Sequence, residues 1–121
     1  MGSIRRWPRP EAPPSLRDEL GELRIAFQVR MHSERVHLVA LSAELARAEG
    51  DPGIIYDDLA VRARRLQGGA EVLEFDEVAA AADSLEKAAY RAAALHTDNA
   101  DTSVWNALVA LVSVMGSYDA R

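Results

Sequence analysis

The sequence predicts an all-α protein, folded as an up-and-down antiparallel four-helix bundle with a Pro-rich N-terminal extension. Alanine and leucine are abundant, whereas aromatic residues make up only 6% of the 121 residues. Apolar residues recur every three or four positions, which is the period of an amphipathic helix, and the alternating β-branched runs typical of strands are absent. Short connections join the periodic segments, and short connections favour antiparallel neighbours.

Four of the five prolines of the chain lie in residues 1–14. Because proline fixes φ and lacks an N–H donor, we expect residues 1–14 to form an extended arm and residues 15–121 to form the helical domain. Trp7 lies between arginines of this arm. We expect the arm to cover apolar surface or to be partly disordered, and the alternative is that it is a peptide ligand for a partner.

A long helix is predicted from about Ser15 to Ala48, with Gly21 as a candidate position for a bend. Its apolar residues form two neighbouring stripes, so the helix is either central in the bundle or also pairs with another chain. The first stripe contains Leu16, Leu20, Leu23, Phe27, Met31, Leu38, Leu41 and Leu45, and the second contains Ile25, Val29, Val36, Val39, Ala43 and Ala46. The turn residues Glu49–Gly53 follow.

Three further helices complete the predicted bundle. They run from about Ile54 to Leu73, from Asp76 to His96, and from Ser103 to Ser117. We expect residues 96–103 to form a turn in which Asp101 or Thr102 caps the last helix.

Composition excludes several classes of function. A net charge of -5 argues against nucleic acid as the main partner, because binding DNA requires clustered basic residues. The chain has no cysteine, which excludes disulfides, thiolate metal sites and a catalytic thiol. No apolar run approaches the ~20 residues that span a bilayer, and the N-terminal residues lack a secretory apolar region, so we expect a cytoplasmic protein without membrane contact.

Two adjacent glycines, Gly68 and Gly69, lie within a predicted helix, where each costs roughly 1 kcal/mol relative to alanine. On a helical wheel, Arg64 and Gly68 lie opposite the apolar stripe, with Val61 near them and Arg65 at the flank. An apolar residue, two cations and bare backbone together outline a docking surface. The alternative is that the glycines permit close helix packing or a kink inside the bundle.

This region resembles the histidine-containing phosphotransfer (HPt) domains of two-component phosphorelays. Their signature reads roughly A-H-x-L-K-G-x-[AS], followed by an apolar residue and a second helix with Leu-Glu near its middle. The resemblance covers Ile54 to about Ala89 and implies an HPt-like bundle. The matching residues are Ala63, Leu66, Gly68, Ala70, Leu73, Val78, Leu85 and Glu86.

The positions that carry the chemistry of that family differ in this chain. Arg64 stands at the position of the phosphorylated histidine, Gln67 at that of a common lysine, and Glu74 at that of a glycine in the following turn. Phosphoryl relay needs a neutral nitrogen nucleophile, whereas arginine keeps its proton at any physiological pH. The resemblance therefore implies a degenerate HPt domain that docks without relaying phosphate.

The implied partner is a response-regulator receiver domain or a histidine kinase. The phosphorylation pocket of a receiver is a cluster of aspartates around a magnesium ion, and the Arg64 guanidinium is expected to pair with such carboxylates and block phosphorylation. No catalytic residue, cofactor or metal site is predicted. The predicted partner-binding residues are Val61, Arg64, Arg65, Gln67, Gly68 and Glu71.

Two alternatives remain open. The chain could be a dimeric scaffold or adaptor that pairs through the wide face of its long helix, or a phosphotransfer protein that uses His32 or His37. These histidines are five residues apart, about 140° around a helix, so they do not form a metal-binding pair. An enzyme is the least supported class, because no pair of carboxylates is set into an apolar cleft by the pattern.

Overall fold

The structure, a computed structural model, describes residues 14–47 and 50–119. Within these residues it contains no strand and four helices: α1 (Pro14–Ala46), α2 (Pro52–Val72), α3 (Asp76–Leu95) and α4 (Asp98–Asp119). The prediction of an all-α four-helix bundle is confirmed. The predicted arm lies outside the described residues, except for Pro14, which begins α1. Helix α1 continues through Gly21 without a break.

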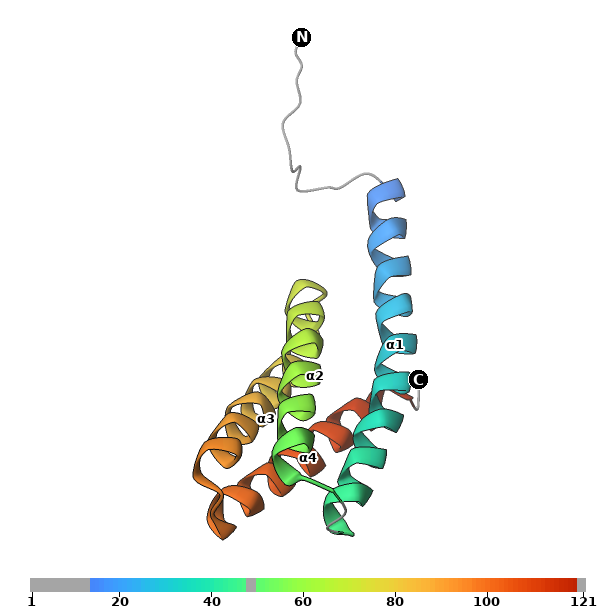
Figure 1. The fold of residues 1–121 in the computed structure, drawn as a ribbon. Coiled ribbons are helices and arrows are strands. Elements are labelled where there is room, and N and C mark those ends of the chain that lie inside the picture. Colours follow the sequence, from blue (N-terminus) through green and yellow to red (C-terminus); the bar gives the residue numbers. More distant parts are fainter. Residues whose placement is uncertain (1–13, 48–49, 120–121) are drawn as a thin grey trace.

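Each helix packs against its neighbours in the sequence, and α4 returns to pack against α1. Figure 1 shows α2 and α3 as a close hairpin, with α4 crossing obliquely toward the middle of α1. The N-terminal turns of α1 extend beyond the end of α2. The most extensive packing is between α2 and α3, the helices that carry the HPt-like pattern.

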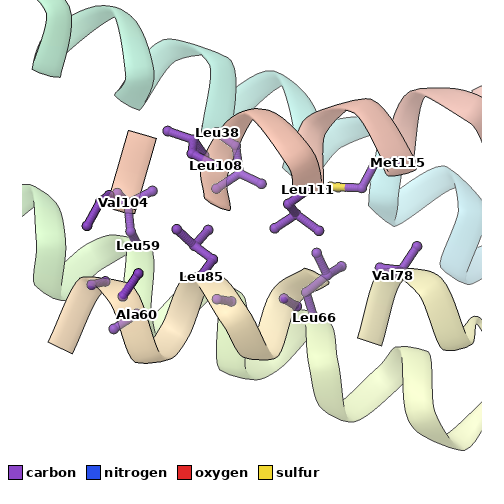
Figure 2. Packing of buried hydrophobic residues seen from close by; sticks show 14 of the residues in the cluster. Leu38, Leu59, Ala60, Leu66, Val78, Leu85, Val104, Leu108, Leu111 and Met115 are labelled. Carbon is purple, nitrogen blue, oxygen red and sulfur yellow. The ribbon is translucent and has the colours of Figure 1, made fainter. Parts of the chain in front are cut away.

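The core lies where the predicted stripes of α2, α3 and α4 meet (Figure 2). The residues predicted to be inward in α2 and α3 are buried, with Leu73 partly buried at the end of its stripe. Their 3.6-residue period accounts for this agreement, because a regular helix presents such a stripe to one side. Among the largest fully buried side chains are Leu38, Leu59, Val78, Leu85, Val104, Leu108, Leu111 and Met115.

Helix α1 buries only part of its predicted first stripe. Phe27, Met31 and Leu38 are buried, whereas Leu20 and Leu23 are exposed. Leu23 lies at the edge of the bundle, where it lines a hollow with Val72 and Leu73 at the end of α2. The second stripe of α1 faces away from the core.

The predicted start of α4 is wrong by about one turn. The helix begins at Asp98, and the cap is provided by Thr97, whose Oγ1 accepts a hydrogen bond from the backbone N–H of Ala100 at 3.1 Å. This places Asp101 and Thr102 inside the first turns instead of at the cap. The preceding residue, His96, ends α3 in the left-handed conformation with a φ of 54°.

The turn between α2 and α3 closes α2 with a Schellman motif. The N–H of Phe75 donates to the carbonyl of Ala70 at 2.8 Å, and that of Glu74 donates to Glu71 at 3.3 Å. Glu74 has a φ of 64°, a region that glycine adopts at least cost. Glu74 therefore holds this turn in a backbone conformation that favours glycine.

The two adjacent glycines have different surroundings. A Cβ atom at residue 69 would lie 2.5 Å from Cε1 of the buried Phe27 ring, whereas no described atom lies within 4 Å of a Cβ at residue 68. Gly69 therefore permits the close packing of α1 on α2, which was the alternative for the pair. Gly68 faces outward, as the wheel predicted.

Alanine at the two glycines should change stability in opposite directions. We expect Gly68→Ala to raise the free energy of unfolding by about 1 kcal/mol through helix propensity. Gly69→Ala should lower it by about 1–3 kcal/mol, because the new methyl group overpacks against Phe27. Urea denaturation of both variants measures the difference, and equal stabilisation by both would contradict this account of Gly69.

Glycine at residue 74 should relieve the left-handed strain of the α2–α3 turn. We expect Glu74→Gly to raise the free energy of unfolding by about 1 kcal/mol, since a non-glycine residue in this conformation costs roughly 1–2 kcal/mol. The control is Glu77→Gly in the first turn of α3, where glycine should destabilise. Thermal unfolding measures the stability of both variants. A loss of stability in both would refute the assignment of strain to Glu74.

Candidate functional site

The predicted partner-binding residues lie on the side of α2 that faces away from the core. Val61, Arg64, Arg65, Gly68 and Glu71 are exposed, and Gln67 is half-buried at the edge toward α3. The Arg64 side chain is 75% exposed, and the backbone at Gly68 has open space in front of it. We call this surface the α2 face.

The structure brings several of these residues together in one open depression between α2 and α3. Its volume is about 370 Å³. Val61 and Arg65 lie outside it. The depression is lined by Arg64, Gln67, Gly68 and Glu71 of α2 and by Asp83 and Glu86 of α3.

Three of the six residues that line this depression are acidic. Nη1 of Arg64 lies 3.9 Å from Oε2 of Glu86, and Nε2 of Gln67 donates to Oδ1 of Asp83 at 3.5 Å. Lys87 pairs with the other carboxylate oxygen of Asp83 at 2.9 Å. At 3.9 Å this contact lies near the distance limit of an ion pair, and the Arg64 side chain is 75% exposed whereas that of Glu86 is only 14% exposed. The Arg64 guanidinium is therefore accessible to a carboxylate of a partner from the solvent side.

The opposite edge of the α2 face is basic. Arg65 lines a hollow of about 270 Å³ together with Arg30 of α1 and Arg62. Arg62 is fixed by Glu34, at 2.8 Å, and by Asp58, at 3.0 Å. The hydrogen bond to Glu34 is the main cause that raises the pKa of Arg62 above its ordinary value. The α2 face is thus a ridge with an acidic flank toward α3 and a basic flank toward α1.

Sequence reasoning missed three residues at this surface. Val72, which is 79% exposed, lies four residues after Gly68 on the same side of the helix. Extending the wheel by one turn would have found it. Asp83 belongs to α3, and Glu86 was noted only as part of the HPt pattern. Their position beside Arg64 depends on how α3 packs against α2, which the sequence pattern does not specify.

A larger groove, of about 400 Å³, lies at the other end of the bundle between the end of α1 and the starts of α2 and α4. Tyr56 and Asp101 line it with Trp105 and Glu44. The Tyr56 hydroxyl donates a hydrogen bond to Asp101. Burial, and then this hydrogen bond, raise the pKa of Tyr56 well above its ordinary value. A tyrosine whose proton is held so firmly is not suited to act as a base or nucleophile near neutral pH.

The histidines lie apart from the α2 face. His32 and His37 are exposed on α1, and Nδ1 of His37 lies 3.1 Å from the carbonyl oxygen of Ser33. None of the three histidines, all of which belong to described residues, lines the depression beside Arg64. Among the described residues, no group of three or more His, Cys, Asp or Glu side chains is arranged to hold a metal ion.

Comparison with known proteins adds no relative. No protein-family model, no curated protein sequence and no solved structure matches this chain. Within residues 14–47 and 50–119, no helix is both long and apolar enough to cross a membrane.

The Tyr56 hydroxyl should make stability depend on alkaline pH. The folded state raises the pKa of Tyr56, whereas the unfolded tyrosine titrates near pH ~10. The contribution of the Tyr56 hydroxyl to the free energy of unfolding is therefore fully present below pH ~10. It is lost as the pH rises further, because the unfolded chain then releases a proton that the folded chain retains.

We expect Tyr56→Phe to lower the free energy of unfolding by about 1 kcal/mol at neutral pH. Above pH ~10, the free energy of unfolding of this variant should fall less steeply with pH than that of the wild type. Urea denaturation at a series of pH values measures both effects. Tyr90→Phe, which alters an exposed tyrosine, is the matched control and should follow the wild-type profile. Parallel profiles for the wild type and Tyr56→Phe would contradict the assignment.

Proposed function

We propose that this chain is a non-catalytic, HPt-like protein that binds a response-regulator receiver domain or a histidine kinase through the α2 face. By occupying its partner it modulates phosphorelay signalling and relays no phosphate itself. The observation that carries the proposal is the exposure of Arg64 beside the open backbone of Gly68. This is the geometry that the resemblance to HPt domains requires of a docking helix.

The absence of relay follows from the chemistry of Arg64. Its guanidinium stays protonated and offers no lone pair for attack on a phosphoryl group. It remains a strong donor to carboxylates, which it can bind with two parallel hydrogen bonds. A residue of this kind holds an acidic partner in place and takes no part in the reaction.

The bare backbone at Gly68 sets how closely a partner can approach. With no side chain there and open space in front of it, a partner surface can contact α2 directly between Arg64 and Val72. Val61 and Val72 provide apolar area within this contact. Apolar area in the centre with charges around it is the usual composition of a protein interface.

The charges around the contact suit a receiver pocket. Arg64, whose side chain is 75% exposed and lies 3.9 Å from Glu86, turns toward an aspartate of the pocket. Glu71 and Asp83, which line the same depression, then face the magnesium ion of the receiver. Arg65 at the basic edge meets the acidic rim of the pocket. Blockage of the aspartates in this way prevents their phosphorylation.

The role of Arg64 can be tested by binding measurements with the receivers and kinases of the source organism. We expect Arg64→Ala to weaken binding about tenfold, or ~1.4 kcal/mol, and Arg64→Glu to weaken it further through repulsion. Gly68→Met should abolish binding without loss of stability, because the new side chain enters open space on the α2 face. Arg91→Glu on α3, an exposed charge reversal outside the depression, is the matched control.

Two outcomes would refute the proposal. One is unchanged affinity in both Arg64 variants and in Gly68→Met. The other is phosphate on His32 or His37 that is labile to acid and stable to base after incubation with an active kinase, which would indicate relay through another histidine. A positive result has a functional counterpart, because the chain should slow phosphorylation of the receiver that it binds.

A further inference from the structure

A second surface lies on the outer side of α1, opposite the side that contacts the core. Ile25, Val29, Val36 and Val39 are between 47% and 67% exposed there. We call this surface the outer α1 stripe. The core-facing residues Phe27, Met31 and Leu38 lie roughly 145° away around the same helix. The bundle therefore leaves the outer α1 stripe open along its whole length.

The spacing of this stripe is that of a coiled coil. The residues Ile25, Val29, His32, Val36, Val39 and Ala43 alternate steps of four and three, which is the heptad pattern of positions a and d. Val29 and Val36 occupy position a, where β-branched residues pack well, and Ile25 and Val39 occupy position d. A solvent-exposed helix face has no need of a regular apolar heptad, so this spacing points to a helical partner.

One flank of the stripe is made of small residues. Ala26, Ser33 and Ala40 follow the d positions and are exposed. No long charged side chain stands at these flanking positions between Ile25 and Ala43. Small flanking residues allow a second helix to approach closely along the stripe.

We propose that the occupant of the outer α1 stripe is the same stripe of a second copy of this chain, running in the antiparallel direction. In this register Ile25 packs against Ala43 of the second copy, Val29 against Val39, and His32 against Val36. The two-fold symmetry repeats each pair in the reverse sense. All the layers between the two Ile25 residues then contain apolar side chains or His32.

Charge selects the antiparallel direction. Asp18 and Glu22 continue the heptad toward the N-terminus, and a parallel pair would place each against its own copy. The antiparallel register instead places Glu22 beside Ala46 and close to Arg47 of the second copy. Glu19 approaches the same arginine along the flank. Opposite charges thus meet at both ends of the interface.

Charge also disfavours one neighbouring antiparallel register. A shift of one heptad that pairs Val29 with His32 would set Glu22 against Val39 and Asp18 against Ala43. Burial of these carboxylates beside apolar residues carries a desolvation cost that the proposed register avoids. Helices α2 and α3 lie on the other side of α1 (Figure 1), and the apolar residues of the outer α1 stripe are exposed.

The stretch from Ile25 to Ala43 is about 27 Å long at 1.5 Å per residue. A pair of helices of this length gives an interface near the lower limit of ~1,000 Å² for specific contacts. We therefore expect a reversible dimer that forms in the micromolar range. The dimer interface shares no residue with the α2 face. A failure of the dimer proposal and a failure of the proposed signalling function are therefore separate results.

Sedimentation velocity of the full chain from about 1 to 200 μM tests the dimer, with dissociation expected within this range. The wild type should shift from monomer to dimer as concentration rises, whereas Val36→Glu should stay monomeric with unchanged thermal unfolding of the monomer. Val109→Glu, at an exposed valine of α4, is the matched control and should dimerise as the wild type does. A wild type that stays monomeric throughout, or a Val36→Glu variant that still dimerises, would overturn the proposal.

Cysteine cross-linking tests the direction and register, and the lack of native cysteine makes each added thiol unique. With a short thiol-reactive linker, a mixture of Val29→Cys and Val39→Cys chains should form a cross-linked heterodimer. Neither variant alone should cross-link efficiently. Efficient self-linking of Val29→Cys would indicate a parallel pair and would overturn the antiparallel register.

Discussion

The contact between Phe27 and Gly69 fixes the position of α1 on the rest of the bundle. A side chain at residue 69 would occupy the space of the Phe27 ring, so the two helices approach this closely only because residue 69 has none. The ring also contacts Phe75, with centroids 5.3 Å apart, and Phe75 contacts Tyr118 of α4 at 5.2 Å. Arg24 lies over Phe75 at 4.3 Å and donates a hydrogen bond to the Leu73 carbonyl. One aromatic cluster thus joins α1, the α2–α3 turn and α4, and it determines which sides of α1 and α2 remain open.

The helical periods of α2 and α3 were sufficient to predict their cores and the outward direction of Arg64 and Gly68. Period alone could not separate the roles of Gly68 and Gly69, because neighbouring positions differ by about 100° and only the placement of Phe27 shows which of them is covered. It also failed at the start of α4, where a single hydrogen bond to Thr97 decides the boundary. The acidic flank beside Arg64 was missed for a related reason: Asp83 and Glu86 come from another helix, and their approach depends on packing. Local pattern thus predicts the side of a helix, whereas the partners of that side come from the tertiary fold.

The α2 face and the outer α1 stripe differ in the kind of contact that they support. The α2 face carries charges of both signs around a small apolar centre, a composition that favours a specific and reversible partner. The outer α1 stripe is nearly free of charge along its central part and has a strict repeat, which favours a partner of the same shape. Because the two surfaces lie on different helices, a pair of chains joined through α1 presents two copies of the α2 face. A partner that is itself dimeric would then bind with an affinity raised by the linkage of its two sites.

Both ends of α3 are bounded by an exposed residue other than glycine in the left-handed conformation, Glu74 on one side and His96 on the other. Neither residue contributes its side chain to the core, so the energetic cost at these turns is separate from the packing that holds the bundle together. A single substitution at either turn can therefore raise the free energy of unfolding without changing the core. The added stability would allow destabilising substitutions on the surfaces of α1 and α2 without loss of the fold. Those surfaces could then diverge toward new partners.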